Sequence, residues 1–552
     1  MKLVYGINNV IRKNNKDGQY YYFGFNFENK QRLLDIGIDL FDTRELISKS
    51  AHEIKFDFIN YITEIGKKQK NELNWWSSKI ASKSNLQTDF FSIVSLLHAF
   101  GSNNNIKSRQ IAVVTDDLRV FVMLKSNFKF DISNYSLLSA LISLLTIVSK
   151  KIILLFINRL YFLIIRSFVN LKSRNYLKTH QGEKLFLYSW VEGRSFNNDL
   201  KCYNDPYFPN INKFIERQED LVYFCPYYVK PKFFKKFGKE YQLDGLSNYS
   251  SFFKVFNSLL YFFIPKGIKP FKSYNLKSLW FFEVLSENAG TSYVSHIHDF
   301  FAWRNFFNKN NGKLVYPFEN QPWEKIMILA NKKMKLSGVL HTTIHNLLLP
   351  FHTTHDEMEY MPTPDEIITN SESTQCLYEE YYGSSKVKIV NAGSLRFNNT
   401  ITTLNLEKKK PIIGIMLSCI RSQTEEMIAD IVKNANLDFQ YLIKLHPDLD
   451  TSVQTTGNIK IFNGSAVELY EKTHAIVYCS STSGIEAYCK GIPVFRFRTQ
   501  YMDLETAENS FSPSIINSIQ DISIQDLEFH KAIPLFSELN ELVWKEILNP
   551  KQ

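Results

Sequence analysis

The chain has 552 residues, of which 44% are hydrophobic and 22% charged, a globular composition that excludes a disordered or low-complexity protein. This length exceeds what one hydrophobic core supports, so at least two domains are expected. The net charge of +10 suits work near phosphates or an anionic membrane. No nucleic-acid-binding motif accompanies the charge, so no nucleic acid partner is expected. Six scattered cysteines and the lack of a basic-then-apolar pattern at residues 1–9 favour a cytoplasmic location.

The N-terminal part, residues 1–130, is a mixed α/β segment whose clearest strand, 110–115, ends at Asp116-Asp117. A mostly apolar stretch follows, and we assign residues 135–178 to a helical insertion that associates with a membrane. Neither of its halves reaches the roughly 18 uninterrupted apolar residues of a membrane span. Lys151, Arg159 and Arg166 fall on one helical stripe, which favours a helix lying in the membrane interface with a cationic edge. The alternative is a hydrophobic helical hairpin packed inside the N-terminal domain.

From residue 183 onward, strands alternate with helices, as in a parallel sheet covered by helices. Apolar runs predict strands at 184–190, 221–225, 314–318, 337–341, 366–369, 387–390 and 411–417, and a helix at 423–435. Two prolines within 360–365 predict a domain boundary. We therefore expect an α/β protein of two Rossmann-like, doubly wound domains that face a central cleft. Its parts would be an acceptor-side domain, 1–362, a nucleotide-sugar-binding domain, 363–525, and a C-terminal helix, 526–552, packing back on the first domain.

Two motifs in the second domain carry the clearest chemistry. The first is a strand that runs into a Lys-x-His-Pro turn and contributes Lys444, His446 and Pro447. The second is a strand followed by a hydroxyl-rich turn that opens a helix, with Ser480, Ser481, Thr482 and Ser483. Hydroxyls and free backbone N–H groups at a helix N-terminus bind anions, so these motifs predict a phosphate site. The alternatives are a turn histidine with satisfied bonds and an ordinary helix cap.

Three more residues belong to this predicted donor site. Glu486, one turn into the same helix, is placed to accept hydrogen bonds from a ribose or a sugar. Ser418 and Arg421 lie on another strand-to-helix turn at the same sheet edge, where Arg421 would reach a phosphate or a base.

The acceptor-side domain offers several carboxylates and histidines at predicted strand exits. Glu319 follows a strand directly and is our first candidate for acid/base or nucleophilic work, its alternative being a helix cap. Asp299 and Glu192 are further catalytic candidates, and turn residues of structural importance are the alternative reading for each. Candidates for substrate binding are Asn320, His341, His345 and Arg194. The histidines do not have zinc-motif spacing, so no metal is expected.

The Lys-Leu-His-Pro and Ser-Ser-Thr-Ser motifs resemble the His-Pro and Ser-Ser motifs of bacterial sialyltransferases, which hold the CMP of their donor in a GT-B fold. Most of the chain also resembles bacterial O-antigen and capsule biosynthesis proteins related to transferases of ulosonic acids such as Kdo, pseudaminic and legionaminic acid. That wider resemblance is carried by Asn74-Trp-Trp-Ser77, Glu192-Gly-Arg-Ser-Phe196, Phe318-Glu-Asn-Gln-Pro-Trp-Glu-Lys325 and Ala392-Gly-Ser-Leu-Arg396.

These resemblances imply that Lys444, His446, Ser480 and Ser481 hold the CMP phosphate, with His446 as acid to the leaving group. Sialyltransferases also carry an acidic-acidic-Gly motif, to which only Glu192-Gly193 and Asp116-Asp117 come near here. The resemblance to retaining Kdo transferases implies a carboxylate nucleophile, for which Glu319 and Asp299 are the candidates.

The expected activity is that of a glycosyltransferase without a required cofactor. It would move a CMP-activated ulosonic acid onto a lipid-linked surface glycan at the inner face of the bacterial inner membrane. Alternatives are a UDP- or GDP-hexose transferase, a glycerol-phosphate transferase, and a non-catalytic, membrane-associated glycan-assembly protein.

Overall fold

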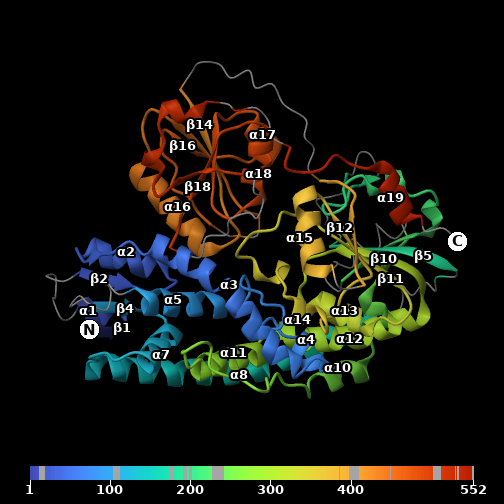
Figure 1. Ribbon diagram of the computed structural model, residues 1–552, viewed down its shortest axis with the longest axis horizontal. Coiled ribbons are helices and arrows are strands. Elements are labelled where there is room, and N and C mark those ends of the chain that lie inside the picture. The colour runs from blue at the N-terminus through green and yellow to red at the C-terminus, as the bar shows by residue number, and fades with distance from the viewer. Residues whose placement is uncertain are drawn as a thin grey trace.

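Three parallel β-sheets organise the chain (Figure 1). The computed structural model describes residues 1–11, 19–103, 112–173, 180, 182–190, 196–197, 202–226, 242–383, 386–396, 410–447, 449, 451–500, 511–528, 530 and 534–549. The sheets have four, seven and six strands in chain order, and a short antiparallel pair, β6 (Phe196–Asn197) with β7 (Cys202–Tyr203), stands apart from them.

The first sheet belongs to the N-terminal segment and has the strand order β1-β4-β2-β3. Its strands are β1 (Lys2–Tyr5), β2 (Gln19–Tyr22), β3 (Asp39–Leu40) and β4 (Ala112–Thr115). Its helices are α1 (Ile7–Ile11), α2 (Phe27–Asp35), α3 (Arg44–Lys67), α4 (Leu73–Trp76), α5 (Phe90–Ser102) and α7 (Leu118–Asn127). Asn26 and Asp117, at the carboxyl ends of β2 and β4, cap α2 and α7 through their side chains. The strand predicted at 110–115 is thus confirmed as β4.

The second sheet has the strand order β13-β12-β11-β10-β5-β8-β9. Its strands are β5 (Glu183–Tyr188), β8 (Leu221–Cys225), β9 (Leu243–Gly245), β10 (Asn311–Pro317), β11 (Lys335–Val339), β12 (Glu366–Thr369) and β13 (Lys388–Asn391). Around it lie α10 (Phe252–Ser258), α11 (Lys277–Ala289), α12 (Thr291–Lys309), α13 (Pro322–Ala330), α14 (His355–Met358) and α15 (Glu372–Tyr382). The sheet is doubly wound, because the strands run outward from β5 on one side and from β10 on the other. The switch point therefore lies between these two strands.

The boundary that the sequence predicts at residue 363 falls within this second sheet. β12 pairs in parallel with β11 and β13, so the chain leaves the sheet only after Asn391. The two prolines behind the prediction, Pro362 and Pro364, lie in the connection that leads into β12. Prolines occur both in linkers between domains and in connections within one domain. They therefore do not distinguish a domain boundary from a loop inside a domain.

The third sheet repeats the doubly wound arrangement, with the order β16-β15-β14-β17-β18-β19. Its strands are β14 (Ile412–Met416), β15 (Gln440–Lys444), β16 (Ile459–Ile461), β17 (Ala475–Tyr478), β18 (Val494–Phe497) and β19 (Ser514–Ile516), and its helices are α16 (Arg421–Asn434), α17 (Ala466–Tyr470) and α18 (Thr482–Cys489). Its switch point lies between β14 and β17. The last helix, α19 (Glu541–Leu548), returns to the second sheet, where Trp544 packs in one core with Leu185 and Leu221.

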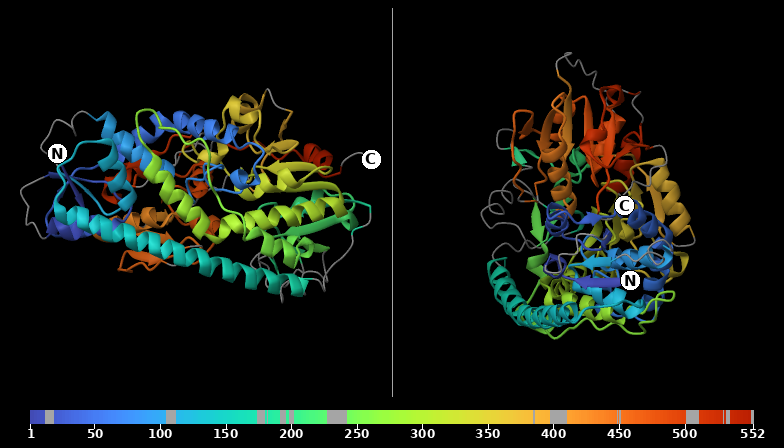
Figure 2. Two further views of the ribbon diagram at one scale, coloured as in Figure 1. Left: turned by 90° about the horizontal axis from the view of Figure 1, so that it is seen from below. Right: turned by 90° about the vertical axis from the view of Figure 1, so that its left-hand side faces the viewer.

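The apolar insertion forms a single helix, α8 (Asn134–Ser173), of 40 residues. Figure 2 shows it as a rod along one side of the molecule, and it packs on α7, α10, α11 and α12. The hairpin interpretation is therefore wrong. Asn134–Val169 is long and apolar enough to cross a membrane, by length and composition. Only 6% of its most apolar 18-residue stretch is buried inside the protein.

The polar and apolar sides of α8 are reversed relative to a helix on a water-exposed surface. Arg159 donates to the backbone carbonyls of Leu259 and Tyr261. Arg166 is buried and donates to Ser295 Oγ at 2.6 Å. The cations thus face the protein, which corrects the expectation of a cationic edge at the membrane. The outer side carries Tyr135, Leu138, Leu141, Ile142, Leu145, Ile152, Ile153, Phe156, Ile157, Leu160, Tyr161, Ile164, Ile165 and Phe168, all exposed.

Candidate functional site

The two doubly wound sheets face each other across the carboxyl ends of their strands. Arg396, just beyond β13, forms an ion pair with Glu486 of α18 at 3.6 Å. Tyr470 of α17 donates to the other oxygen of the Glu486 carboxylate at 3.1 Å. Glu486, expected to contact a ribose or sugar, therefore also joins the two domains in this structure.

The hydroxyl-rich turn lies at the switch point of the third sheet. Ser481 is the N-cap of α18 and accepts from the N–H of Ser483. Ser480 Oγ accepts from the Gln423 side chain at 3.0 Å, which ties this turn to α16. Gly484 lets the helix lie close to β17, since a Cβ there would come within 2.4 Å of the Tyr478 ring. A helix N-terminus with hydroxyl groups at a switch point is an anion-binding arrangement.

The Lys-x-His-Pro turn follows β15, which β14 separates from β17. Lys444 Nζ donates to the Gly464 carbonyl at 2.6 Å, and His446 and Pro447 continue the turn, with His446 half-buried. Ser418, at the exit of β14 between the two motifs, is fully buried, and its hydroxyl accepts from the N–H of Ile420. The hydroxyl of Ser418 thus shapes this turn, and its contact with the donor stays a prediction.

Glu319 lies at the switch point of the second sheet, at the exit of β10. Its carboxylate is 3.6 Å from His341 Nε2, at the exit of β11. Burial raises the pKa of Glu319 to about 7. Burial, and then the charge of Arg396, lower the pKa of His341 to about 3, so this imidazole is neutral at physiological pH. Together they provide a carboxyl group that titrates near neutrality beside an uncharged histidine.

Glu319 is not the residue that caps α13. Gln321 is the N-cap of α13 and forms a capping box with Glu324, whose Oε1 accepts from the N–H groups of both Glu319 and Gln321 at 2.9 Å. Beside Glu319 and His341 lie half-buried aromatic rings. Trp190 contacts Tyr207 and Trp323 with centroid distances of 5.2 and 5.4 Å, and Tyr207 meets the His341 ring edge-on. Such faces suit stacking against a sugar ring.

Other predicted site residues lie elsewhere. Asp299 is on α12, 3.8 Å from Arg166 of α8, so its carboxylate faces that helix interface and not the cleft, which corrects its catalytic assignment. Asn320 is buried, adopts a left-handed conformation with φ 57° and donates to the Pro350 carbonyl at 2.6 Å; its contact with substrate stays a prediction. His345 is buried, and its carbonyl accepts from His352. Glu192 and Arg194 lie outside the described residues.

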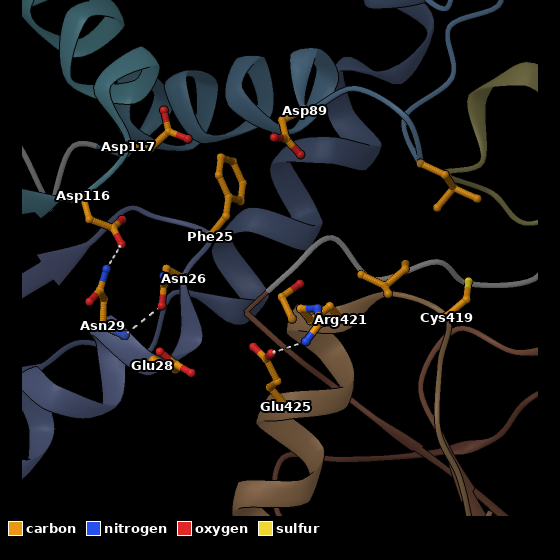
Figure 3. A pocket seen from close by; sticks show the side chains of 13 residues that line it. Phe25, Asn26, Glu28, Asn29, Asp89, Asp116, Asp117, Cys419, Arg421 and Glu425 are labelled. Atoms are coloured by element: carbon orange, nitrogen blue, oxygen red, sulfur yellow. Dashed lines mark hydrogen bonds and ion pairs between the residues drawn. The ribbon is translucent and has the colours of Figure 1, made fainter. Parts of the chain in front are cut away.

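Sequence reasoning missed a cavity of about 840 Å³ between the first sheet and the third (Figure 3). It is lined from one side by residues at the carboxyl ends of β2 and β4, including Asp116, and from the other by the first turn of α16. The available signal was the Asp116-Asp117 pair directly after a strand. Arg421, expected at the donor phosphate, lines this cavity and pairs with Glu425 at 3.6 Å. Among the described residues, no group of three histidine, cysteine or acidic side chains is arranged to hold a metal ion.

No family model and no curated protein matches the chain. Among solved structures, the glycosyltransferase of kitacinnamycin aligns with a TM-score of 0.33 and 9% identity, over 58% of this chain and 81% of that one. The wall teichoic acid polymerase TagF aligns with a TM-score of 0.32 and 10% identity, over 70% of this chain and 91% of TagF. SnogD, a glycosyltransferase from Streptomyces nogalater, aligns with a TM-score of 0.30 and 12% identity, over 57% of this chain and 82% of SnogD.

The fold class rests on the strand orders themselves. Two parallel, doubly wound sheets that meet at their carboxyl edges make this an α/β protein of GT-B-like fold, as the sequence predicts. The four-stranded N-terminal sheet is an addition to that plan.

Proposed function

We propose that the chain is a glycosyltransferase that moves a CMP-activated ulosonic acid onto a lipid-linked surface glycan. The observation that carries this proposal is that the switch points of two domains face each other, with the domains joined by the Arg396–Glu486 ion pair. One presents a hydroxyl-capped helix N-terminus, and the other presents Glu319, whose pKa lies near 7. The first arrangement suits a leaving phosphate, and the second suits a carboxyl group that accepts a proton or attacks a sugar.

On the donor side, the N-terminus of α18 and the hydroxyls of Ser480 and Ser481 would bind the CMP phosphate. Lys444, at the exit of β15 two strands away, would add positive charge, and His446 on the same turn would add a hydrogen-bonding imidazole. These groups stabilise the charge that develops on the phosphate oxygen as the bond to the sugar breaks. No cofactor is required by this chemistry.

On the acceptor side, the reaction joins an acceptor oxygen to the anomeric carbon of the ulosonic acid. In an inverting reaction, the acceptor hydroxyl gives its proton to Glu319 while the bond to CMP breaks. In a retaining reaction, Glu319 bonds to the anomeric carbon as the bond to CMP breaks. The acceptor oxygen then displaces Glu319, and the acceptor proton passes to the departed CMP phosphate. Either course needs the ionised carboxylate, which a pKa of about 7 makes available at neutral pH.

The decisive experiment compares nucleotides in a thermal-shift assay with CMP, UDP and GDP. CMP at about 100 times its Kd stabilises the folded state by about 2.7 kcal/mol, whereas UDP and GDP give no shift. Stabilisation by UDP or GDP but not CMP would instead favour a hexose transferase. Because a glycerol-phosphate transferase that uses CDP-glycerol also releases CMP, mass spectrometry of products from CMP-Kdo and from CDP-glycerol separates these two activities.

The proposed acceptor is lipid-linked because α8 presents an apolar surface next to the catalytic domains. Phe252, Phe253 and Phe256 of α10 extend this surface with exposed rings. A helix of 40 residues is about 60 Å long, against roughly 30 Å of hydrocarbon in a bilayer. Since α7, α10, α11 and α12 cover its other side, α8 would lie in the plane of the membrane interface and not cross it.

Liposome flotation tests this placement. The chain with Phe156→Glu and Ile153→Glu on the outer side of α8 is expected to lose binding to anionic liposomes. The control, Leu437→Glu, changes an exposed apolar side chain in the turn before β15 and should still float. If the wild-type chain ignores liposomes, the membrane placement is wrong, while the nucleotide assay remains informative about the transferase.

A further inference from the structure

The cavity between the first and third sheets has two walls from distant parts of the chain (Figure 3). One wall contains Phe25, Glu28 and Asp116, which follow strands β2 and β4. The other wall contains Arg421 and Ser422, at the start of α16. At about 840 Å³, the space matches the size of small-ligand sites, which hold several hundred cubic ångströms.

The two walls are held together beside the cavity. Lys30 of α2 donates to Gln500 at 2.9 Å and lies 3.8 Å from Glu426 of α16. Arg44 of α3 donates to the carbonyl of Asn517 at 2.9 Å. Because these contacts join the first sheet to the third, the cavity is a defined part of the folded chain.

The lining is strongly acidic. Five carboxylates line it, Glu28, Asp89, Asp116, Asp117 and Glu425, against one cation, Arg421. Arg119 neutralises part of this charge from behind, because it donates to Asp117 at 2.6 Å and to Asp89 at 2.7 Å. The excess of negative charge disfavours a phosphate or nucleotide here.

Asp116 is a built-in acceptor. Asn29 donates to its Oδ2 at 2.7 Å, and burial raises the pKa of this carboxyl group. The carboxylate fits because residue 24 is glycine, where a Cβ would come within 2.2 Å of Oδ1. A carboxylate on this wall of the cavity accepts hydrogen bonds from a hydroxyl or an amine of a ligand.

We propose that this cavity binds a hydroxyl-rich sugar chain, neutral or amino-bearing, which is the acceptor glycan of the proposed transferase. Carboxylates and amides accept and donate hydrogen bonds to sugar hydroxyls, and the Phe25 ring offers an apolar face for a sugar ring. The described side chains do not form a metal site, which favours a polyol over a metal ion.

The first turn of α16 connects this cavity to the donor side. Arg421 and Ser422 line the cavity, and Gln423, the next residue, donates to Ser480 in the hydroxyl-rich turn. A glycan in the cavity would therefore lie next to the donor phosphate site, as an acceptor must. This inference rests on the proposed function, but the ligand chemistry of the cavity can be tested separately from it.

The test measures binding of three tetrasaccharides by isothermal titration calorimetry: N-acetylchitotetraose (neutral), the glucosamine tetramer (cationic) and a heparin tetrasaccharide (anionic). We expect the neutral or the cationic chain to bind and the anionic chain not to bind. Phe25→Ala should weaken binding about tenfold by loss of the ring face, and Glu28→Lys should weaken the cationic chain by at least as much. Glu28 is exposed, so this second variant should fold normally.

The control Glu541→Lys makes the same charge change on α19, away from the cavity, and should bind all three chains as the wild type does. The inference is overturned if neither the neutral nor the cationic chain binds, if heparin binds best, or if Phe25→Ala and Glu28→Lys leave binding unchanged. CMP stabilisation, measured in parallel, reports on the donor site. If CMP binds but no glycan binds, the cavity assignment alone is refuted. If a glycan binds but CMP does not, the donor assignment alone is refuted.

Discussion

Replacing Glu319 with glutamine removes the titrating carboxyl group of the second sheet while keeping its shape. Burial raises the pKa of this group from 4.5 to about 7, a rise worth about 3 kcal/mol if fully expressed. The side chain is 30% exposed, so solvent screening reduces the expected effect to about 1–2 kcal/mol.

The direction of the stability effect follows from the raised pKa. The folded chain holds the proton more tightly than the unfolded chain, so this stabilisation is complete below the unfolded pKa near 4.5 and is lost as the pH rises through about 7. Glu319→Gln should therefore equal the wild type in stability near pH 4.5. At pH 8 it should be more stable by about 1–2 kcal/mol, because it buries no charge.

The catalytic effect runs the other way. Wild-type kcat/KM should rise with pH up to about 7 and then level off, as the carboxylate ionises. Glu319→Gln should lose activity by about 10² to 10⁴ and should lose this pH dependence. The assay follows CMP release from CMP-Kdo, and urea unfolding at pH 5 and pH 8 gives the stabilities.

A matched control separates burial from catalysis. Glu287 of α11 is buried, and its pKa is also raised to about 7 by burial, but it accepts from the backbone of Lys79 and not from groups of the cleft. Glu287→Gln should gain stability at high pH without losing activity. The reasoning about Glu319 is refuted if its glutamine variant retains more than a tenth of wild-type activity, or if its stability relative to the wild type is the same at pH 5 and pH 8.

Three further predictions concern the donor side. Ser481→Ala should lower stability by about 1 kcal/mol and also abolish the thermal shift with CMP, whereas Ser465→Ala, which removes the equivalent cap of α17, should lower only the stability. Unchanged CMP binding by Ser481→Ala would contradict the phosphate site. Gly484→Ala should weaken CMP binding at least tenfold, because its methyl group pushes α18 away from Tyr478; calorimetry with CMP decides this. Activity should survive dialysis against EDTA, and loss that returns with added Mg²⁺ would show that a metal takes part.

Much of the fold is readable from local sequence. Buried parallel strands are short apolar runs, and those predicted at 221–225 and 366–369 coincide with β8 and β12. The Ser480–Ser483 cluster and Glu319 also stand where local patterns put them, at strand exits, because carboxyl ends of parallel strands are where polar side chains gather. These features depend on a few neighbouring residues, so the sequence alone is enough for them.

Contacts between distant segments could not be read this way. The helical stripe of α8 shows that Arg166 shares a face with other cations, but only its pairing with Ser295 shows that this face is turned inward. Asp299 looked catalytic until α8 was seen to cover it. The cavity depends on Asp116 and Arg421, 305 positions apart, meeting across two sheets.

The sequence by itself therefore determined the α/β class, most strands and the two strand-exit motifs, because hydrophobic period and capping are local properties. The tertiary structure alone decided the strand orders, the extent of the second sheet and the separate four-stranded first sheet. It also decided which polar groups are satisfied within the protein and which remain open to a ligand. The physical reason is that burial and charge pairing depend on how segments far apart in the chain pack together.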